Sequence, residues 1–325
     1  MTIGVVGAGA WGTALAQVMA GDGSDVLIWA REPEVVEAVN RDRVNSLFLP
    51  DRPLSPRIRA TGELDDLNGC EALLIVVPAQ HLRSVLSGLT PGTAPLVLCS
   101  KGIEAGSMLL LSEVAAALHP EATVAALSGP TFAFEVAGGL PTAVTLAAEQ
   151  DHVAAALAAR FARPTFRPYA STDLVGAEIG GAVKNVLAIA CGVVEGLRLG
   201  QNARAALISR GFAEMTRFGM ARGARAETLA GLSGLGDLVL TCSSTSSRNF
   251  SLGKGLGEGQ SAAALLADRR TVAEGAFTAP VLREAARAAG VEMPVVDAVC
   301  ALLDGHVDAP RVAEALLSRP LRVEG

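Results

Sequence analysis

Several features that mark particular classes of protein are missing from this sequence. The 325-residue chain has no run of 18 uncharged apolar residues, so we expect no membrane-spanning segment. Lysine and arginine number 27 against 33 aspartate and glutamate residues, and the net charge of −6 argues against general nucleic-acid binding. Any site for an anionic ligand must therefore be built locally.

Metal and nucleophile signatures are also missing. The five cysteines form no CxxC pair and their number is odd, which indicates buried, reduced thiols in a reducing compartment. The four histidines lack metal-ligand spacing, and no GxSxG or Cys–His signature occurs. Strand-like sequence begins at Ile3, so no signal or transit peptide is expected. We therefore expect a cytoplasmic protein without a metal site.

Strand-like and helix-like segments alternate up to about residue 172. This alternation predicts parallel βαβ units with right-handed crossovers, covered by helices on both faces. A polar, proline-rich loop is expected at 41–57. Strands are expected at 2–7, 25–30, 72–78, 95–102, 123–127, 142–147 and 165–171, and helices at 11–21, 34–40, 80–87, 108–118 and 151–162.

After residue 172 the strand signals stop. Residues 173–199 form one long apolar helical stretch, and further helical patterns follow at 203–222, 278–289, 294–304 and 309–318. We predict an α/β protein with an N-terminal Rossmann-type, doubly wound, mostly parallel sheet in domain 1–172 and an all-helical domain in 173–325. The apolar C-terminal helices suggest a homodimer.

The strongest local motif is the glycine-rich sequence Gly7-Ala8-Gly9-Ala10-Trp11-Gly12. It lies between a predicted strand and a predicted helix, which is the context of a dinucleotide-binding turn. Gly7 would permit the tight turn, Gly9 the approach of a pyrophosphate, and Gly12 the packing of the helix on the strand. The helix N-terminus would offer N–H groups to the phosphates. The alternative is a turn that binds no ligand.

The end of the second strand bears on the choice of cofactor. NAD-selective sites place a carboxylate there, whereas this chain has Arg31 followed by Glu32. A guanidinium would bind the 2′-phosphate of NADP, so NADPH is favoured and NAD remains possible. A shift of one residue would restore an acid, and Arg31 is otherwise an ordinary exposed charge.

Two polar side chains stand in strongly apolar helical sequence. Lys184 lies in a segment that is apolar on nearly every face, and burial lowers the pKa of a lysine toward the range useful for acid–base catalysis. Asn185 follows it. Asp237 is the single carboxylate of the segment 231–242, and a buried carboxylate needs a cation or several donors. The alternatives are a lysine that reaches solvent and a helix-capping aspartate.

Further candidates lie where anions would be bound. Lys101 follows a predicted strand, and ligands bind beyond the carboxyl ends of such strands. Arg248 and Asn249 end a Ser/Thr-rich stretch, and hydroxyls, an amide and a guanidinium suit a phosphate. The alternatives are a solvated loop charge for Lys101 and a surface loop for 241–249.

At this point the residues resemble a known family, the bacterial-type NAD(P)-dependent glycerol-3-phosphate dehydrogenases. The similarity runs from Ile3 to about residue 320, with the motifs in the order and spacing of the family. The motifs are GAGAWGTALA (7–16), SKGIE (100–104), SGPTFAFEVAGGLPTA (128–143), GGAVKNVLAI (180–189), GLGDLVLTC (234–242), SRN (247–249) and GVEMP (290–294).

The resemblance implies a fold like that of 6-phosphogluconate dehydrogenase and a defined reaction. The reaction is the NAD(P)H-dependent interconversion of dihydroxyacetone phosphate and sn-glycerol 3-phosphate, the precursor of phospholipids. The implied catalytic residues are Lys184, Asp237 and Lys101. The implied substrate contacts are Lys101, Gly129, Thr131, Lys184, Asn185, Asp237, Ser247, Arg248 and Asn249, and the implied cofactor contacts are Gly7, Gly9, Ala10, Trp11, Gly12, Arg31, Lys101, Ala133, Arg248, Val272 and Glu274.

Two positions depart from the family pattern, since Ala10 stands where serine is frequent and Ala273 where valine is common. Neither bears on the chemistry. One alternative is a related reductase of the 6-phosphogluconate or ketopantoate type, which would lack the combined SGPTFA and SRN motifs. Another is a nucleotide sensor without turnover, which would not need Lys184 and Asp237 together.

Overall fold

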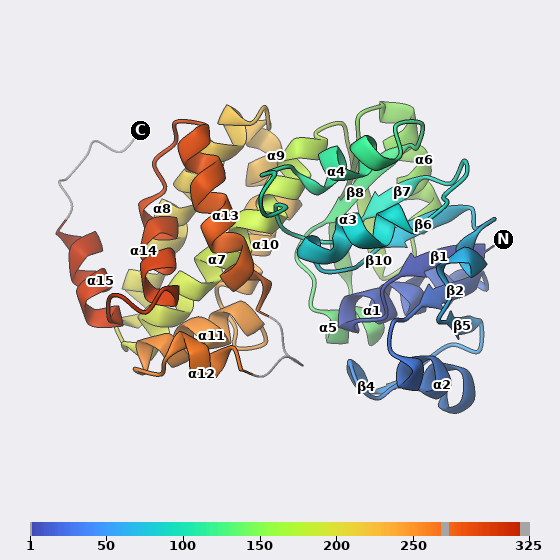
Figure 1. The fold of residues 1–325 in the computed structure, drawn as a ribbon, viewed down its shortest axis with the longest axis horizontal. Helices are drawn as coiled ribbons and strands as arrows, with labels where there is room; N and C mark the ends of the chain where they lie inside the picture. The colour runs from blue at the N-terminus through green and yellow to red at the C-terminus, as the bar shows by residue number, and fades with distance from the viewer. Residues whose placement is uncertain (1, 268–272, 319–325) are drawn as a thin grey trace.

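The computed structural model describes residues 2–267 and 273–318, in an N-terminal half built on a sheet and a helical C-terminal half (Figure 1). The eight strands lie in the order β10-β9-β8-β7-β6-β1-β2-β5, and all neighbours are parallel except β8 and β9. This confirms the predicted fold class. The strands are β1 (Thr2–Val6), β2 (Asp25–Trp29), β5 (Ile58–Thr61), β6 (Ala72–Ile75), β7 (Leu96–Leu98), β8 (Val124–Ser128), β9 (Thr142–Ala148) and β10 (Phe166–Ser171).

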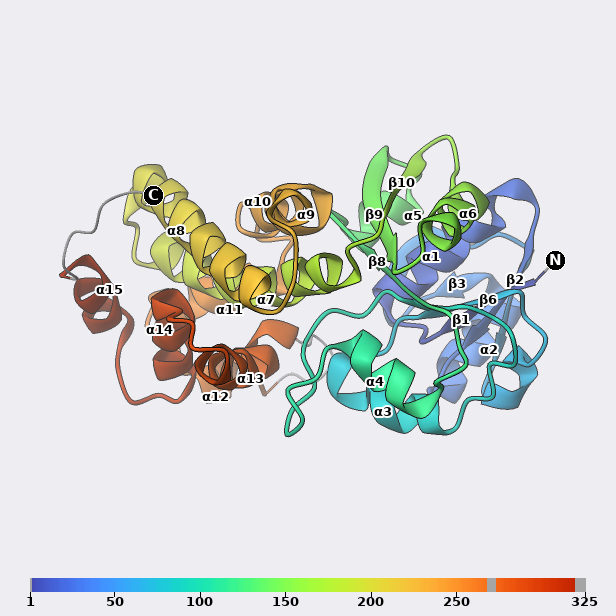
Figure 2. The same cartoon turned by 90° about the horizontal axis from the view of Figure 1, so that it is seen from above.

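The two faces of the sheet bury two separate hydrophobic clusters. Side chains along β6 alternate between them: Leu74 joins one cluster, and Leu73 and Ile75 join the other, as the two-residue repeat of a strand requires. Figure 2 shows helices on both sides of the sheet. The first cluster packs against α1 (Ala10–Met19), α2 (Pro33–Asp42), α5 (Ala133–Ala137) and α6 (Asp151–Phe161), and the second against α3 (Ala79–Ser87) and α4 (Leu111–Leu118).

The C-terminal half is organised around one central helix, α7 (Leu174–Gly196). By length and composition it is the one helix among the described residues that could cross a membrane, but 94% of its apolar window is buried inside the protein. It is therefore a core helix. The other helices are α8 (Gly200–Ala221), α9 (Ala226–Ala230), α10 (Asp237–Thr241), α11 (Arg248–Gly257), α12 (Ala262–Leu265), α13 (Glu274–Ala288), α14 (Pro294–Leu303) and α15 (Ala309–Leu317).

Glycines bring α7 and α11 into backbone contact. A Cβ on Gly192 would lie 2.0 Å from the carbonyl oxygen of Phe250, and one on Gly253 would lie 1.9 Å from that of Ile189. Only residues without side chains allow this approach. The same glycines hide the helical pattern of α11 in the sequence, so residues 248–257 were not predicted as a helix.

Three other expectations need correction. The segment 41–57 is not a simple loop, because β3 (Val44–Asn45) and β4 (Leu49–Pro53) form an antiparallel pair within it. Two prolines in β4 conceal the strand, and proline is tolerated only where a ladder bond is not needed. The edge strand β5 was missed because its four residues alternate poorly. Helix α4 begins at Leu111 rather than 108, since Met108 has a φ of 58°.

The last strand ends at Ser171 and α7 begins at Leu174. The division into independent domains at residue 172 stays a prediction.

All five cysteines are buried and unpaired, as their spacing indicated.

Candidate active site

The glycine-rich turn lies where β1 meets α1. Gly7 has a φ of 115°, which favours glycine, and a Cβ on Gly12 would lie 1.9 Å from the carbonyl oxygen of Gly7. Both positions therefore require glycine for the turn itself. A Cβ on Gly9 would meet no atom within 4 Å, so open space adjoins the backbone there.

This turn suits the phosphates of a dinucleotide. Gly9 is the N-cap of α1, which begins at Ala10. No side chain caps this helix, and its first turn contains no acidic residue. The N–H groups of the first helical turn then remain for an anion. Trp11 adds a buried indole Nε1 without a hydrogen-bond partner, a donor that a ligand would satisfy. The residues present therefore fit a bound dinucleotide.

Two of the remaining predicted cofactor residues, Arg31 and Ala133, lie on segments next to β1 and α1. Arg31 follows β2, with its side chain 76% exposed, and donates to the Glu32 carboxylate at 3.2 and 2.9 Å. Ala133 opens α5, which packs against α1. Val272 lies outside the described residues.

Two lysines from the two halves of the chain meet on one carboxylate. Nζ of Lys184, on α7, lies 2.5 Å from Oδ1 of Asp237, and Nζ of Lys101, just after β7, lies 2.6 Å from Oδ2. Lys184 is 6% exposed and Asp237 is fully buried. Lys184 lies on α7, and Figure 2 shows this helix running from the helical half toward the sheet. This burial excludes the alternatives that Lys184 reaches solvent and that Asp237 serves only as a helix cap.

The electrostatics of Lys184 follow from this packing. Burial, together with the charge of the neighbouring Lys101, lowers the pKa of Lys184 to about 8, against the opposing effect of Asp237. An ordinary lysine, with a pKa of about 10.4, would stay almost fully protonated at pH 8. The ammonium is therefore poised to exchange a proton near neutrality.

Lys101 is held by three elements at once. Its Nζ also donates to the carbonyl oxygen of Gly129 at 3.3 Å, and Thr131 Oγ1 donates to the same oxygen at 3.3 Å. A Cβ on Gly181 of α7 would lie 3.1 Å from Cγ of Lys101, so the lysine stem occupies the space this glycine leaves. Thus Lys101, Gly129 and Thr131, predicted separately, form one connected group with Asp237.

A second group of predicted residues forms where α7, α11 and α13 meet. Asn249 donates to Oδ1 of Asn185 at 3.0 Å and accepts from the backbone N–H of Gly275 at 2.9 Å. Ser247 caps α11 by accepting from Phe250 N, which places Arg248 in the first helical turn. The surface-loop alternative therefore holds only in part: Ser243, Thr245 and Ser246 are exposed, whereas Ser247 and Asn249 are buried.

Glu274 connects the two groups electrostatically. Burial raises the pKa of Glu274, while the charges of Arg248, Lys101 and Lys184 act in the opposite direction. All three cations therefore lie within electrostatic reach of one carboxyl group. Most of the site residues expected from the sequence thus gather at the carboxyl edge of the sheet, where α7 reaches it.

One polar neighbour of Lys184 was not predicted. Thr241 Oγ1 accepts from Lys184 Nζ at 3.0 Å and donates to Oδ1 of Asp237 at 3.2 Å. The only sequence signal was its position four residues after Asp237, which places both on one face of a helix.

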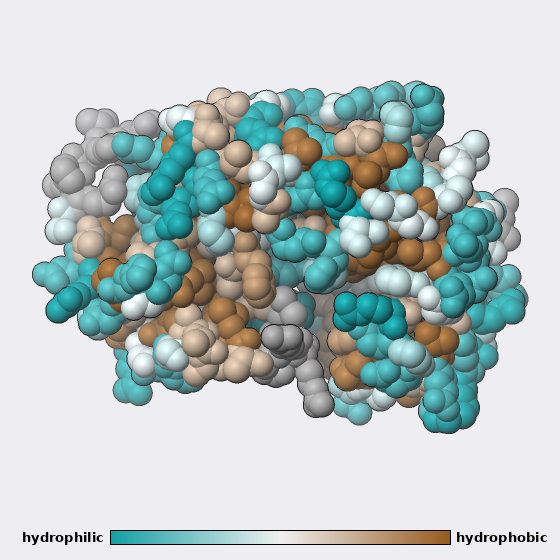
Figure 3. All heavy atoms as spheres, in the orientation of Figure 1, coloured by the Kyte–Doolittle hydropathy of each residue, from teal (hydrophilic) through white to brown (hydrophobic). Residues whose placement is uncertain are grey.

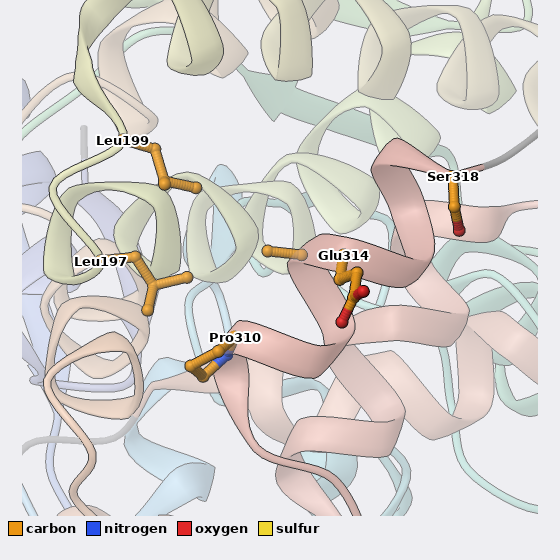
Figure 4. A pocket seen from close by; sticks show the side chains of 6 residues that line it. Leu197, Leu199, Pro310, Glu314 and Ser318 are labelled. Atoms are coloured by element: carbon orange, nitrogen blue, oxygen red, sulfur yellow. The ribbon is translucent and has the colours of Figure 1, made fainter.

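A shallow apolar pocket of about 520 Å³ lies elsewhere, between the end of α7 and α15 (Figure 4). Its lining residues are Leu197, Leu199, Pro310, Ala313, Glu314 and Ser318. None of these lining residues belongs to the groups of site residues described above.

Among the described residues no group of three or more histidine, cysteine, aspartate or glutamate side chains could hold a metal ion.

Comparison with known proteins identifies the family. Residues 2–154 match the family described as NAD-dependent glycerol-3-phosphate dehydrogenase N-terminus, and residues 173–314 match the corresponding C-terminus. The chain belongs to the NAD-dependent glycerol-3-phosphate dehydrogenase family. The resemblance seen in the sequence is thereby confirmed.

Individual members of the glycerol-3-phosphate dehydrogenase family match over nearly their whole length. The protein named glycerol-3-phosphate dehydrogenase (NAD(P)+) from Novosphingobium aromaticivorans is 66% identical over 323 residues, 99% of this chain and 98% of its own. Its namesake from Zymomonas mobilis is 58% identical over 322 residues, 99% and 94% respectively. The crystal structure of glycerol-3-phosphate dehydrogenase from Coxiella burnetii superposes with a TM-score of 0.93 at 38% identity, covering 98% of this chain and 99% of that one.

Proposed function

We infer that this chain is an oxidoreductase that interconverts dihydroxyacetone phosphate and sn-glycerol 3-phosphate with NAD(P)H. Family membership and the named relatives support the reaction. The observation that carries it in the structure is the pair of lysines on the buried Asp237, at the sheet edge that bears the glycine-rich turn. The product would supply phospholipid biosynthesis.

We propose that Lys184 handles the proton of the reaction. The nicotinamide, when bound, supplies a hydride to the ketone carbon, and the ketone oxygen then needs a proton. A lysine ammonium has three N–H donors, and Lys184 commits two of them, to Asp237 and Thr241. The third would donate to the substrate oxygen and transfer its proton there. Asp237 and Thr241 fix the direction of that donor.

Lys101 would stabilise the same oxygen as a second cation. Its donors to Asp237 and the Gly129 carbonyl hold it in place, so no reorganisation is needed as negative charge develops. With one carboxylate between two ammonium groups, the cluster keeps a net positive charge. That charge favours an oxyanion at this position.

We propose that the start of α11 binds the substrate phosphate. Arg248 offers a guanidinium fork, and the first turn of α11 offers N–H groups and a partial positive charge. Asn249 has one amide hydrogen engaged by Asn185, and its second remains for a phosphate oxygen. Phosphate binding at one end would orient the carbonyl at the other.

We further propose that NADPH is preferred over NADH, which stays possible. Arg31 is exposed, and its pairing with Glu32 is a surface ion pair of little net stability. A 2′-phosphate with two negative charges would draw the guanidinium away from Glu32.

A cytoplasmic homodimer is the assembly we propose. The five buried, unpaired cysteines are typical of a reducing compartment. Hydrophobic residues reach the surface of the helical half (Figure 3), and Leu199, Met220 and Phe277 are among the exposed large apolar side chains. Sedimentation equilibrium tests this, and a monomer at micromolar concentration would contradict it.

The experiment that tests the function is NADPH oxidation at 340 nm driven by dihydroxyacetone phosphate. We expect turnover with this substrate and none with ketopantoate, and no NADP reduction with 6-phosphogluconate. Turnover of one of the acids instead would favour the related reductases. Nucleotide binding without turnover of any of them would indicate a sensor.

A further inference from the structure

The loop that carries Lys101 is built into both halves of the molecule. It connects β7 to α4, and its residues Ile103 and Leu110 are fully buried in the same hydrophobic cluster as α7. Gln80 of α3 donates to the carbonyl oxygen of Ile103 at 2.9 Å and holds the other side of the loop. The position of Lys101 therefore depends on how α7 and the start of α4 are joined.

A buried carboxylate makes that joint. Glu178 lies on α7, six residues before Lys184, and is 8% exposed. Its Oε1 accepts from the backbone N–H of Ser112 at 2.9 Å, its Oε2 accepts from the Ser112 hydroxyl, and the Leu111 backbone also donates to it. These N–H groups belong to the first turn of α4 and have no partner within that helix. A side chain of the helical half thus caps a helix of the sheet half.

We propose that Glu178 is a positioning residue that holds the start of α4 against α7 and so keeps Lys101 and Lys184 together on Asp237. The role rests on the proposed function, because it concerns the geometry of those two lysines. Their distances to the carboxylate, 2.6 and 2.5 Å, leave little room for displacement of either. Without the cap, the Lys101 loop could move relative to α7, and Lys101 would leave Asp237.

A second contact joins the same elements at the surface. Arg222, after α8, contacts the Glu113 carboxylate at 3.1 Å, and Glu113 accepts from Leu110 N at 2.6 Å. This pair is partly exposed, so it adds little to the joint. Burial, together with the charge of Glu113, raises the pKa of Glu178 to about 7, against the lowering effect of the hydrogen bonds from Ser112 and Leu111. Uncharged glutamine is therefore a close substitute for the buried acid.

The chain contains a matched control for this residue. Glu214, on α8, is 3% exposed and accepts from the backbone N–H of Val295, at the start of α14, at 2.9 and 3.1 Å. Burial raises its pKa to about 7 as well. Glu214 therefore makes the same kind of cap, but between two helices of the C-terminal half that carry none of the candidate site residues.

The test compares Glu178→Ala, Glu178→Gln and Glu214→Ala in the NADPH oxidation assay, with the melting temperature of each. Because a misplacement of about 1 Å can reduce a rate about 100-fold, we expect Glu178→Ala to lower kcat about 10- to 100-fold, with the KM for NADPH within about twofold of wild type. Glu178→Gln keeps an acceptor for Ser112 N, and its amide N–H would donate to the Ser112 hydroxyl, which then accepts instead of donating, so its kcat should stay within about threefold. Glu214→Ala should lower the melting temperature and leave the kcat of the folded enzyme unchanged.

The outcomes separate this role from a general effect on stability. Equal losses of kcat in Glu178→Ala and Glu214→Ala, or wild-type kcat in Glu178→Ala, would overturn the proposal. If Glu178→Ala does not fold, Glu178→Asp replaces it, because its carboxylate is one methylene shorter and cannot keep both contacts to Ser112, and wild-type kcat in that variant would overturn the proposal equally. A wild-type enzyme inactive on dihydroxyacetone phosphate would overturn the proposed function itself, whereas an active wild type isolates the role of Glu178.

Discussion

Lys184 and Asp237 form a buried ion pair, with Nζ 2.5 Å from Oδ1, across the contact between α7 and α10. Removing one partner of such a pair leaves an uncompensated charge and costs about 3–5 kcal/mol. Here the carboxylate serves two ammonium groups, because Lys101 occupies its other oxygen. Asp237 is therefore the residue on which the geometry of the cluster depends.

Asp237→Asn should impair catalysis more than binding. The amide would keep the shape of the side chain but remove the charge that offsets Lys101 and Lys184. We expect kcat to fall at least about 100-fold, as expected when catalytic groups lose their alignment, and the protein to lose stability. Steady-state kinetics and thermal melting measure both. A kcat within threefold of wild type would show that the carboxylate does not organise the site.

The pH dependence of the reaction rates should reflect the protonation of Lys184. Burial lowers its pKa to about 8, so the ammonium needed for ketone reduction is present below that pH and is lost above it. The reduction rate should therefore fall as pH rises through 8, and oxidation of glycerol 3-phosphate, which needs the neutral amine, should rise over the same range. Profiles of kcat/KM in both directions measure this. A reduction rate that stays level to pH 10 would contradict it.

Cofactor preference should depend on Arg31. In Arg31→Ala the guanidinium for the 2′-phosphate is lost, so the ratio of kcat/KM for NADPH to that for NADH should fall about 10-fold or more, typical of a lost charge-assisted contact. Glu32→Gln provides the opposite change, because it frees Arg31 from its carboxylate partner and should raise the ratio. An unchanged ratio in both variants would place the selectivity elsewhere.

Gly181→Ala should disturb Lys101 with little effect on stability. Its Cβ would lie 3.1 Å from both Lys101 Cγ and Ser128 Oγ, which is too close without a shift. We expect kcat to fall about 10-fold, while alanine adds up to about 1 kcal/mol of helix propensity. Gly192→Ala is the contrasting variant, since its Cβ would meet the Phe250 carbonyl at 2.0 Å and should destabilise the fold. A fully active Gly181→Ala enzyme would contradict this packing.

The sequence predicted the main features because they are local or chemically costly. The glycine-rich turn was recognisable because Gly7 and Gly12 are required by backbone geometry alone. Lys184 stood out because a charge in apolar sequence must find a partner. The alternation of strands and helices followed from hydrophobic periodicity.

Other features depend on contacts between distant segments, and the sequence could not show them. The pairing of Lys101 with Asp237 joins residues 136 positions apart. Helix α11 has so many glycines that its propensity is low, and it forms because its backbone packs directly on α7. Glu178 resembled an ordinary helical glutamate, and only the position of α4 shows it to be a cap.

The central claim is that Lys184 provides the proton for ketone reduction, and its most direct test is single-turnover oxidation of bound NADPH by dihydroxyacetone phosphate in Lys184→Ala. The control is Lys254→Ala, since Lys254 is a partly exposed lysine of α11 paired with Glu258. We predict that Lys184→Ala binds NADPH with unchanged affinity and loses at least about 1,000-fold in rate, within the range of general acid catalysis, while Lys254→Ala matches wild type. A Lys184→Ala enzyme that oxidises NADPH at the wild-type rate would contradict the claim.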